Sequence, residues 1–125
     1  MVLNRTPERA AGLAKRFGLA YGGLDGAAGI VSGMDLVVNA TAAGLEGASP
    51  LPEGTRFKEG AWAVDLLYRP KETPFMAQAR AAGARPLGGL GMLVRQGARA
   101  WKLFFGDALK DDEVRGGETY LGGLL

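Results

Sequence analysis

Short apolar runs alternate along this chain with segments of helical periodicity, and this alternation constrains the fold more than any other feature. Met34–Asn39 and Ala61–Leu67 are apolar runs of the kind that form buried parallel strands, and Ala84–Leu87 is a shorter run. Helical or glycine-rich segments separate them. The pattern predicts the α/β class, with a three-layer, mostly parallel sheet that carries helices on its faces.

The ends of the predicted helices are marked by capping residues. Thr6-Pro7-Glu8 combines an N-cap hydroxyl, a proline at the first helical position and an acid in the first turn, and Gly18 ends this helix. Thr73-Pro74 repeats the signal for a helix that runs to about Ala82. Gly44–Glu59 is predicted to be a loop because of its Gly and Pro content.

The longest predicted helix, Met92–Phe105, opens after Gly88-Gly89-Leu90-Gly91. It has a polar stripe and an apolar face that includes Trp101 and Phe104, which is typical of a helix packed on a core. The acids from Asp111 to Glu113 could begin a last helix. Two Gly-Gly pairs weaken that prediction, because each glycine costs about 1 kcal/mol relative to Ala in a helix.

The composition excludes several function classes. The chain has 125 residues, enough for one domain, and a formal net charge of +2, which argues against a general nucleic-acid binder. It has no Cys and no His, so disulfides, thiol nucleophiles, His-dependent catalysis and zinc sites with Cys or His ligands are excluded. No apolar stretch approaches the roughly 18 residues of a membrane span. We expect a cytoplasmic protein without membrane association or a metal.

The start of the chain suggests an incomplete sheet. Only Val2 and Leu3 precede the polar Asn4, so the chain begins where a strand is already ending. A parallel sheet of this kind normally offers a strand and helix before this point. We therefore expect residues 1–125 to form one domain that is truncated at its N-terminus.

The first candidate site follows that short strand. In a dinucleotide-binding sheet, an acid at the end of the second strand binds the ribose of NAD, whereas an arginine accommodates the 2′-phosphate of NADP. Here Asn4, Arg5 and Thr6 occupy the strand end and Arg9 lies one helical turn further on, with no acid at the strand end. The arrangement predicts NADP. The alternative is a capped surface helix with solvated arginines.

The second candidate site is Asn39-Ala40-Thr41-Ala42-Ala43-Gly44, at the carboxyl end of the Met34–Asn39 run. Ligands of open α/β sheets bind outside the carboxyl ends of the strands. The small side chains of Ala40 and Thr41 would let a flat ring lie against the backbone. The alternative is an Asx-type turn that simply leaves the sheet.

Two further segments carry possible ligand contacts. Asp65 is expected to satisfy buried donors, a structural role, while Tyr68 presents a hydroxyl at the sheet edge and is equally consistent with a partly buried structural tyrosine. The glycines near Gly89 permit a ligand to approach a helix start. Met92 and Gln96 follow on that helix, where an apolar core face and a solvated face are the simpler alternatives.

In this order and at these spacings the four segments resemble the C-terminal NADP-binding domain of the shikimate dehydrogenase family. The family pattern runs Asn-Arg-Thr-x-x-Arg-Ala, Asn-Ala-Thr-x-x-Gly, Asp-x-x-Tyr-x-Pro-x-x-Thr-Pro and Gly-Leu-Gly-Met-Leu-Val-x-Gln, and the chain contains each of them. The resemblance covers about Val2 to Gly106. It implies a Rossmann-like sheet and a part in the NADP-dependent reduction of 3-dehydroshikimate to shikimate, a step of aromatic amino-acid biosynthesis.

The resemblance also implies a role for each matched position. One group would surround the 2′-phosphate of NADP: Asn4, Arg5, Thr6 and Arg9. Ala40 and Thr41 would pass beside the cofactor. A further group would line the nicotinamide pocket: Leu66, Gly89 and Met92. Tyr68 and Gln96 would reach hydroxyls of the substrate, shikimate or 3-dehydroshikimate.

The family has two parts that this chain lacks. Its N-terminal domain holds most of the substrate site and a catalytic Lys–Asp pair, and a Gly-x-Gly-x-x-Gly turn cradles the pyrophosphate of the cofactor. We therefore predict no catalytic residue in the chain and no dehydrogenase activity of the chain alone. The alternative is a non-catalytic remnant or an interaction module, which would complete its sheet with another chain or form a homodimer through an exposed strand edge.

Overall fold

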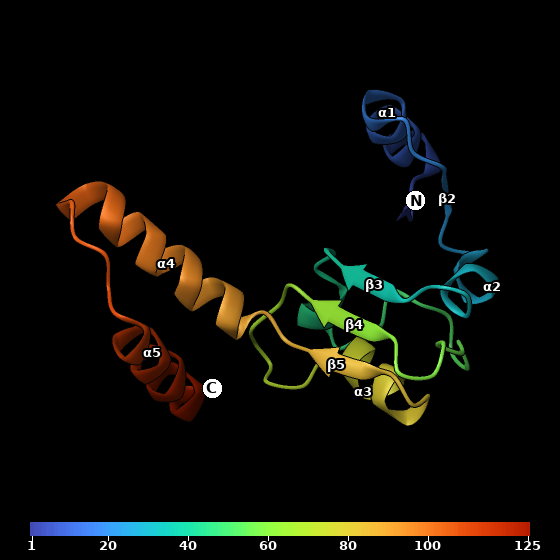
Figure 1. Cartoon of the computed structure of the whole chain (residues 1–125). Helices are drawn as coiled ribbons and strands as arrows, with labels where there is room; N and C mark the ends of the chain where they lie inside the picture. The colour runs from blue at the N-terminus through green and yellow to red at the C-terminus, as the bar shows by residue number, and fades with distance from the viewer.

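The computed structural model describes residues 1–125. The protein has an α/β fold with two parallel sheets. The first sheet pairs β1 (Val2–Asn4) with β2 (Tyr21–Gly23), and α1 (Pro7–Phe17) connects and covers them. The second sheet has the order β3-β4-β5, with β3 at Leu36–Asn39, β4 at Trp62–Asp65 and β5 at Arg85–Leu87. Figure 1 shows the two sheets as separate units. The α/β class and the parallel pairing are confirmed.

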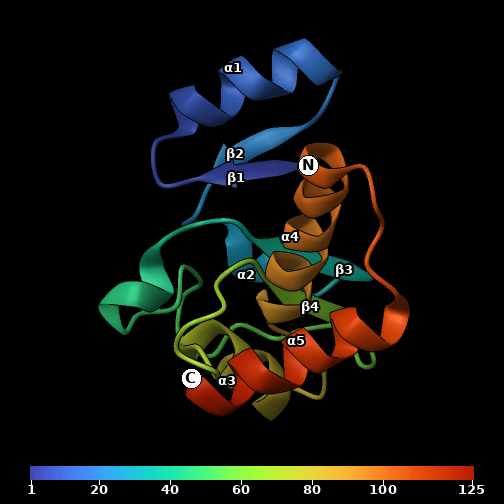
Figure 2. The ribbon, with the colours of Figure 1, turned by 90° about the vertical axis from the view of Figure 1, so that its left-hand side faces the viewer.

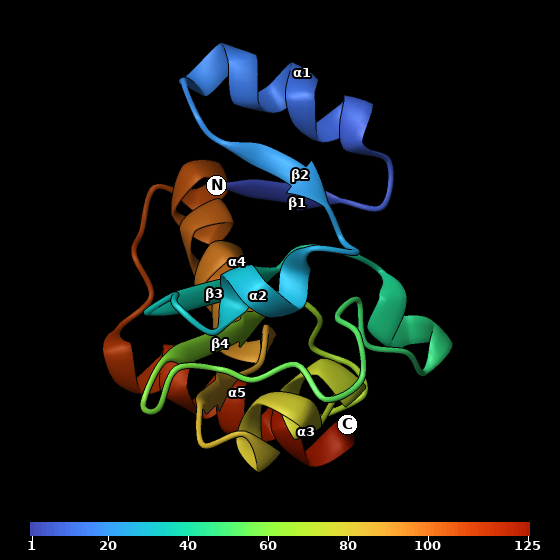
Figure 3. The same cartoon turned by 90° about the vertical axis from the view of Figure 1, so that its right-hand side faces the viewer.

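No strand of this chain lies between β1 and β3. Figures 2 and 3 show β1–β2 above β3–β4 from opposite sides, with β1 and β3 as the inner strands. In the first sheet, the amide of Val2 donates to the carbonyl of Ala20 beside β2. In the second sheet, the carbonyl of Asp35 accepts from the amide of Trp62, and the carbonyl of Asn39 accepts from the amide of Leu66. Backbone groups of a parallel strand alternate in direction. The backbone groups of Leu3, Leu36 and Val38 therefore point to the free edges.

The core of the second sheet lies on one face. The short helix α2 (Ala27–Val31) and α3 (Pro74–Ala81) contribute buried residues there, and Phe57 packs edge-on against Phe75 with the ring centroids 6.0 Å apart. The complete cluster is Ala27, Val31, Leu51, Phe57, Ala63, Phe75, Met76, Ala79 and Ala84. Thr73 begins α3 as predicted, because its hydroxyl accepts from the amide of Met76 at 3.3 Å.

The strands are less buried than the apolar runs predicted. Leu36 is 56% exposed and Val38 is 51% exposed, whereas Ala63 and Asp65 on β4 are fully buried. Side chains alternate between the two faces of a strand, and helix α3 covers only one of these faces. The expectation of fully buried strands was therefore wrong for β3 and β4, which are buried on one face.

The C-terminal helices α4 (Leu90–Phe105) and α5 (Asp111–Leu124) pack against each other and project from the second sheet (Figure 1). No residue of α4 is buried, and Phe104 is 82% exposed, so the expected packing of its apolar face on a core was wrong. Helix α5 forms despite its glycines. Three acids favour its first turn, and the Glu113 carboxylate accepts from the amide of Lys110 at 2.7 Å.

Three short elements were not predicted from the sequence: β2, α2 and the 3-10 helix η1 (Ala43–Glu46), which lies inside the predicted loop. Each is five residues or fewer, too short to show a period. No helix is long and apolar enough to cross a membrane.

Candidate cofactor and substrate site

The candidate residues follow the carboxyl ends of the parallel strands. Asn4 ends β1, Asn39 ends β3, Asp65 ends β4 and Leu87 ends β5. Asn39 is the direct partner of Asp65 across the β3–β4 pair. In open parallel sheets this edge is where ligands bind, because the loops and helix N-termini gather there.

The residues around Arg5 form a polar turn between β1 and the N-terminus of α1. The side chain of Asn4 accepts from the amide of Thr6 at 2.8 Å. Thr6 is the N-cap residue of α1 as predicted, but its hydroxyl makes no cap hydrogen bond, and Asn4 shapes the turn instead. Arg5 and Arg9 are exposed, and neither takes part in an ion pair. Two guanidinium groups and a hydroxyl are thus free to bind an anion, with Glu8 as the one acid of the turn.

The loop after β3 is built on Asn39. Its side-chain oxygen accepts from the amide of Thr41 at 3.0 Å and from the Thr41 hydroxyl at 2.7 Å. The predicted Asx turn is therefore present in this segment. Ala40 and Thr41 are exposed at the end of the sheet, while Asn39 is buried beneath them.

Asp65 occupies the buried centre of this sheet edge. Its carboxylate accepts from the Asn39 amide at 3.1 Å, from the Thr73 hydroxyl at 2.6 Å and from the backbone amide of Leu67 at 3.0 Å. The expectation that Asp65 satisfies buried donors is confirmed. These bonds tie the loop after β3, the turn after β4 and the start of α3 into one unit.

Gly89 brings the end of β5 against the turn after β4. A Cβ atom at Gly89 would lie 2.2 Å from the carbonyl oxygen of Leu66, and the Gly89 amide donates to the carbonyl of Leu67 at 2.8 Å. Only a glycine permits this approach. Leu66 and Gly89, which the sequence placed in one pocket, are therefore neighbours.

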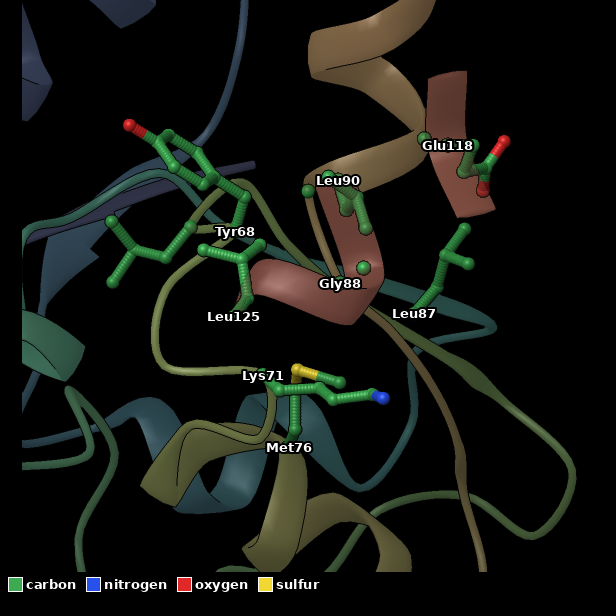
Figure 4. Close-up of a pocket in the computed structure, with 12 residues that line it drawn as sticks. Tyr68, Lys71, Met76, Leu87, Gly88, Leu90, Glu118 and Leu125 are labelled. Carbon is green, nitrogen blue, oxygen red and sulfur yellow. The ribbon is translucent and has the colours of Figure 1, made fainter. Parts of the chain in front are cut away.

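Two adjoining pockets open beside Gly89. Tyr68 and Gly89 line a pocket of about 230 Å³, together with Lys71 from the loop before α3 and Leu125 from the C-terminus (Figure 4). A second pocket of about 240 Å³ is lined by a set that includes Leu66, Gly89 and Met92. The structure thus brings together the residues assigned to the nicotinamide pocket and places Tyr68 at its border.

The remaining predicted residues lie outside these pockets. Gln96 is exposed on α4 and lines neither pocket, and neither do Thr41 or the residues around Arg5. Sequence reasoning missed Glu118, which lines both pockets from α5 and lies 3.9 Å from Arg95 as an ion pair. Nothing in the motif pattern marks it, because α5 reaches the site only through its packing on α4.

The arrangement can bind and orient a ligand at the edge of the sheet. No group of three acidic side chains is placed to hold a metal ion. Asp65 belongs to the lining of the second pocket, but it is fully buried and its carboxylate is occupied by three donors. The site therefore has the character of a ligand platform at the edge of a sheet.

Comparisons with known proteins show which family this chain is similar to. Residues 89–115 match the family model described as the shikimate 5′-dehydrogenase C-terminal domain. The NADP(+)-dependent shikimate dehydrogenase of Thermus thermophilus is 49% identical over 107 residues, which cover 84% of this chain and 39% of that protein. The chain therefore spans about two fifths of the length of this relative.

Solved structures show the same fold. The Thermus thermophilus shikimate 5-dehydrogenase in complex with NADP(H) and shikimate superposes with a TM-score of 0.79 and 41% identity, over 94% of this chain and 44% of the other. The quinate dehydrogenase of Corynebacterium glutamicum in complex with NAD gives a TM-score of 0.76 at 25% identity, over 92% and 44% of the two chains. The fold thus occurs with both nicotinamide cofactors.

Proposed function

We propose that this chain is the NADP-binding part of a shikimate dehydrogenase, because residues 89–115 match the model of that family's C-terminal domain and the Thermus thermophilus enzyme is 49% identical over 107 residues. The complete enzyme would reduce 3-dehydroshikimate to shikimate with NADPH. The chain spans 39% of its curated relative, so it would contribute the cofactor site and part of the substrate site. Its lack of Cys is compatible with the reducing cytoplasm, where we place this activity.

The free arginine pair after β1 is the observation that carries the choice of NADP. Arg5 and Arg9 flank a helix N-terminus without any ion-pair partner, and no acid ends β1. A phosphate on the 2′-position would receive charge-assisted hydrogen bonds there, whereas the ribose of NAD would find no carboxylate. Thr6 supports the proposal because its hydroxyl is not used for capping.

The second half of the proposed site is the pocket beside Gly89. The close approach of Gly89 to Leu66 leaves a wall without side chains against which a flat ring can lie. Leu66 and Met92 supply apolar contacts. When bound, NADPH would supply the hydride, and Tyr68 and Gln96 would help to orient the substrate hydroxyls.

We infer that the chain alone binds cofactor but does not turn over substrate. Its only buried acid, Asp65, is held by three donors, and no lysine side chain lies near it as an ion-pair partner. Transfer of the hydroxyl proton requires a group within hydrogen-bond reach of the substrate. That group would come from the remaining part of the enzyme.

An amide-resolved NMR titration of the 125-residue chain tests the proposal. NADP should shift the amides of Arg5, Thr6 and Thr41 as well as those near Gly89, since the cofactor would span both sheets. Dispersed spectra that do not respond to millimolar NADP would contradict the proposal. Shifts confined to unrelated surfaces would contradict it equally.

A second candidate function is sheet completion with another chain. The backbone groups of Leu3, Leu36 and Val38 point to free edges, and such edges are templates for strand pairing. A module of this kind would associate without binding nucleotide. Sedimentation of the chain over a range of concentrations, with and without NADP, separates the two functions.

A further inference from the structure

Asp65 is a fully buried carboxylate with no ion-pair partner. Burial of a charged group is costly unless each oxygen is hydrogen-bonded, and here Oδ2 accepts from Asn39 and Thr73 while Oδ1 accepts from Leu67. These three hydrogen bonds satisfy the buried carboxylate without a counter-charge. It joins three segments that carry or support the proposed site.

The bond to Asn39 fixes the orientation of that amide. The Nδ2 group of Asn39 donates to Asp65, so the Oδ1 atom must point to Thr41, where it accepts from both the amide and the hydroxyl. Without an acceptor at position 65, nothing would hold the Asn39 side-chain amide in this orientation. In the reverse orientation its NH2 group would face the amide and the hydroxyl of Thr41, which are both donors. The conformation of the Ala40–Thr41 loop therefore depends on Asp65 through Asn39, although Asp65 makes no hydrogen bond to Ala40 or Thr41.

The bond to Leu67 sets the other side of the site. The Leu67 amide donates to Asp65, while the Leu67 carbonyl accepts from Gly89. The turn that carries Leu66 and Tyr68 is thereby held between β4 and the start of α4. One carboxylate thus supports the loop after β3 and the turn after β4 together.

We propose that Asp65 is a positioning residue that couples the Ala40–Thr41 loop to the Leu66–Tyr68 turn, so that the two bind one cofactor in a fixed register. This inference rests on the proposed function. Asp65 belongs to the lining of the second pocket, but its carboxylate is fully buried and occupied by three donors, so it acts through the segments that it joins. The residues around Arg5 belong to the other sheet, so their affinity for a phosphate should not depend on Asp65.

The test uses two ligands on the 125-residue chain. NADP would engage both sheets, whereas adenosine 2′,5′-bisphosphate, which lacks the nicotinamide half, would engage only the Arg5 region. Asp65→Asn places an NH2 donor against the groups that donate to Asp65, and it should weaken NADP binding about 10-fold or more. The affinity for adenosine 2′,5′-bisphosphate should change less than about 2-fold. The control is Asp25→Asn, which removes an exposed carboxylate that takes part in no ion pair.

A paired variant provides the rescue. In Asn39→Asp with Asp65→Asn, the carboxylate at 39 can accept from Thr41 and from the new amide at 65, and the amide oxygen at 65 can accept from Leu67. The Thr73 hydroxyl loses its acceptor in both Asp65→Asn and the double variant, so the comparison of these two variants isolates the bond between positions 39 and 65. The double variant should return NADP affinity to within about 3-fold of the unchanged chain. A role in packing alone predicts no such recovery.

Amide hydrogen exchange of the ligand-free chain measures the coupling between the Ala40–Thr41 loop and the Leu66–Tyr68 turn directly. In Asp65→Asn the amides of Thr41 and Leu67 should lose protection together, and both should regain it in the double variant. Unchanged protection at Thr41 would overturn the inference, as would equal weakening of both ligands or a failed rescue. If the unchanged chain binds neither ligand, the proposed function fails, and the exchange data still decide whether Asp65 couples the two segments.

Discussion

The backbone of Gly89 lies so close to Leu66 that a Cβ atom on Gly89 would sit 2.2 Å from the Leu66 carbonyl oxygen. The φ of Gly89 is −75°, a value that any residue can adopt, so the glycine is required by the contact and not by the backbone conformation. This contact fixes the first turn of α4 against the end of β4. It also leaves the wall of the proposed nicotinamide pocket free of side chains.

Gly89→Ala should destabilise the chain by about 1–3 kcal/mol, because the new methyl group meets backbone atoms that cannot rotate away. Urea unfolding measures the change. Gly97→Ala is the matched control in the same helix, where a Cβ would meet nothing within 4 Å, and it should stabilise by up to about 1 kcal/mol. Equal effects of the two substitutions would contradict the contact.

Arg5→Ala should weaken NADP binding by roughly 10- to 150-fold, the equivalent of one charge-assisted hydrogen bond of about 1.5–3 kcal/mol. NAD binding should change little. Arg16→Ala removes the same charge from the last turn of the same helix and should leave both affinities unchanged. Calorimetric titration measures all four values, and an unchanged preference for NADP over NAD in Arg5→Ala would rule out the assigned role.

Salt should weaken NADP binding more than NAD binding. Arg5 and Arg9 are exposed, so their attraction to a phosphate is screened as the Debye length falls from about 10 Å at 0.1 M salt to about 3 Å at 1 M. Dissociation constants at several salt concentrations give the two slopes. Parallel slopes would mean that the 2′-phosphate is not held by these side chains.

Thr73→Val should destabilise the chain by about 2–3 kcal/mol, since it removes a hydroxyl that donates to the buried Asp65 and caps α3. Thr73→Ser keeps the hydroxyl and should lose much less. Thermal unfolding of both variants measures the difference. If the two variants unfold alike, the hydrogen bonds of Thr73 contribute no net stability.

Two proline variants separate the free edge of β3 from its paired edge. The Leu36 amide points to the free edge, so Leu36→Pro removes an unpaired donor, whereas Val37→Pro removes a bond to β4 and should unfold the second sheet. If the chain self-associates through β3, Leu36→Pro should make it monomeric in sedimentation experiments. Persistent association of a folded Leu36→Pro variant would place the interface elsewhere.

The sequence predicted the elements that have strong local signals. Thr73-Pro74 and Gly18 mark helix ends by capping and by a left-handed turn, and both signals are present in the structure. Thr6 precedes α1 as predicted, but its hydroxyl makes no cap, because the Arg9 amide donates to the Thr6 carbonyl at 3.0 Å instead. A capping pattern does not show whether the first free amide of a helix will donate to the hydroxyl or to the carbonyl of the cap residue.

Burial was harder to predict because it depends on what covers each face. Leu36 and Phe104 belong to apolar patterns that are typical of a core, yet both are largely exposed. The second sheet is covered on one face only, and α4 contacts mainly α5. Periodicity identifies which residues share a face, but not whether another element packs on it.

The sequence predicted individual residues of the candidate site better than the hydrogen bonds and helix packing that link them. The motifs placed Leu66, Gly89 and Met92 in one pocket, and in the structure the three residues line a common pocket. They gave no indication that Glu118 joins them or that Asp65 links Asn39 to Leu67. Those links depend on strand register and on helix packing, which span many residues in sequence.

The most direct test of the central claim is the affinity of the unchanged chain for NADP and for NAD, measured by calorimetry in the same low-salt buffer. The free arginine pair predicts that NADP binds at least about 10-fold more tightly, because NAD lacks the phosphate that Arg5 and Arg9 would hold. Equal affinities for the two cofactors, or saturable binding of neither, would contradict the claim that this chain is an NADP-binding domain.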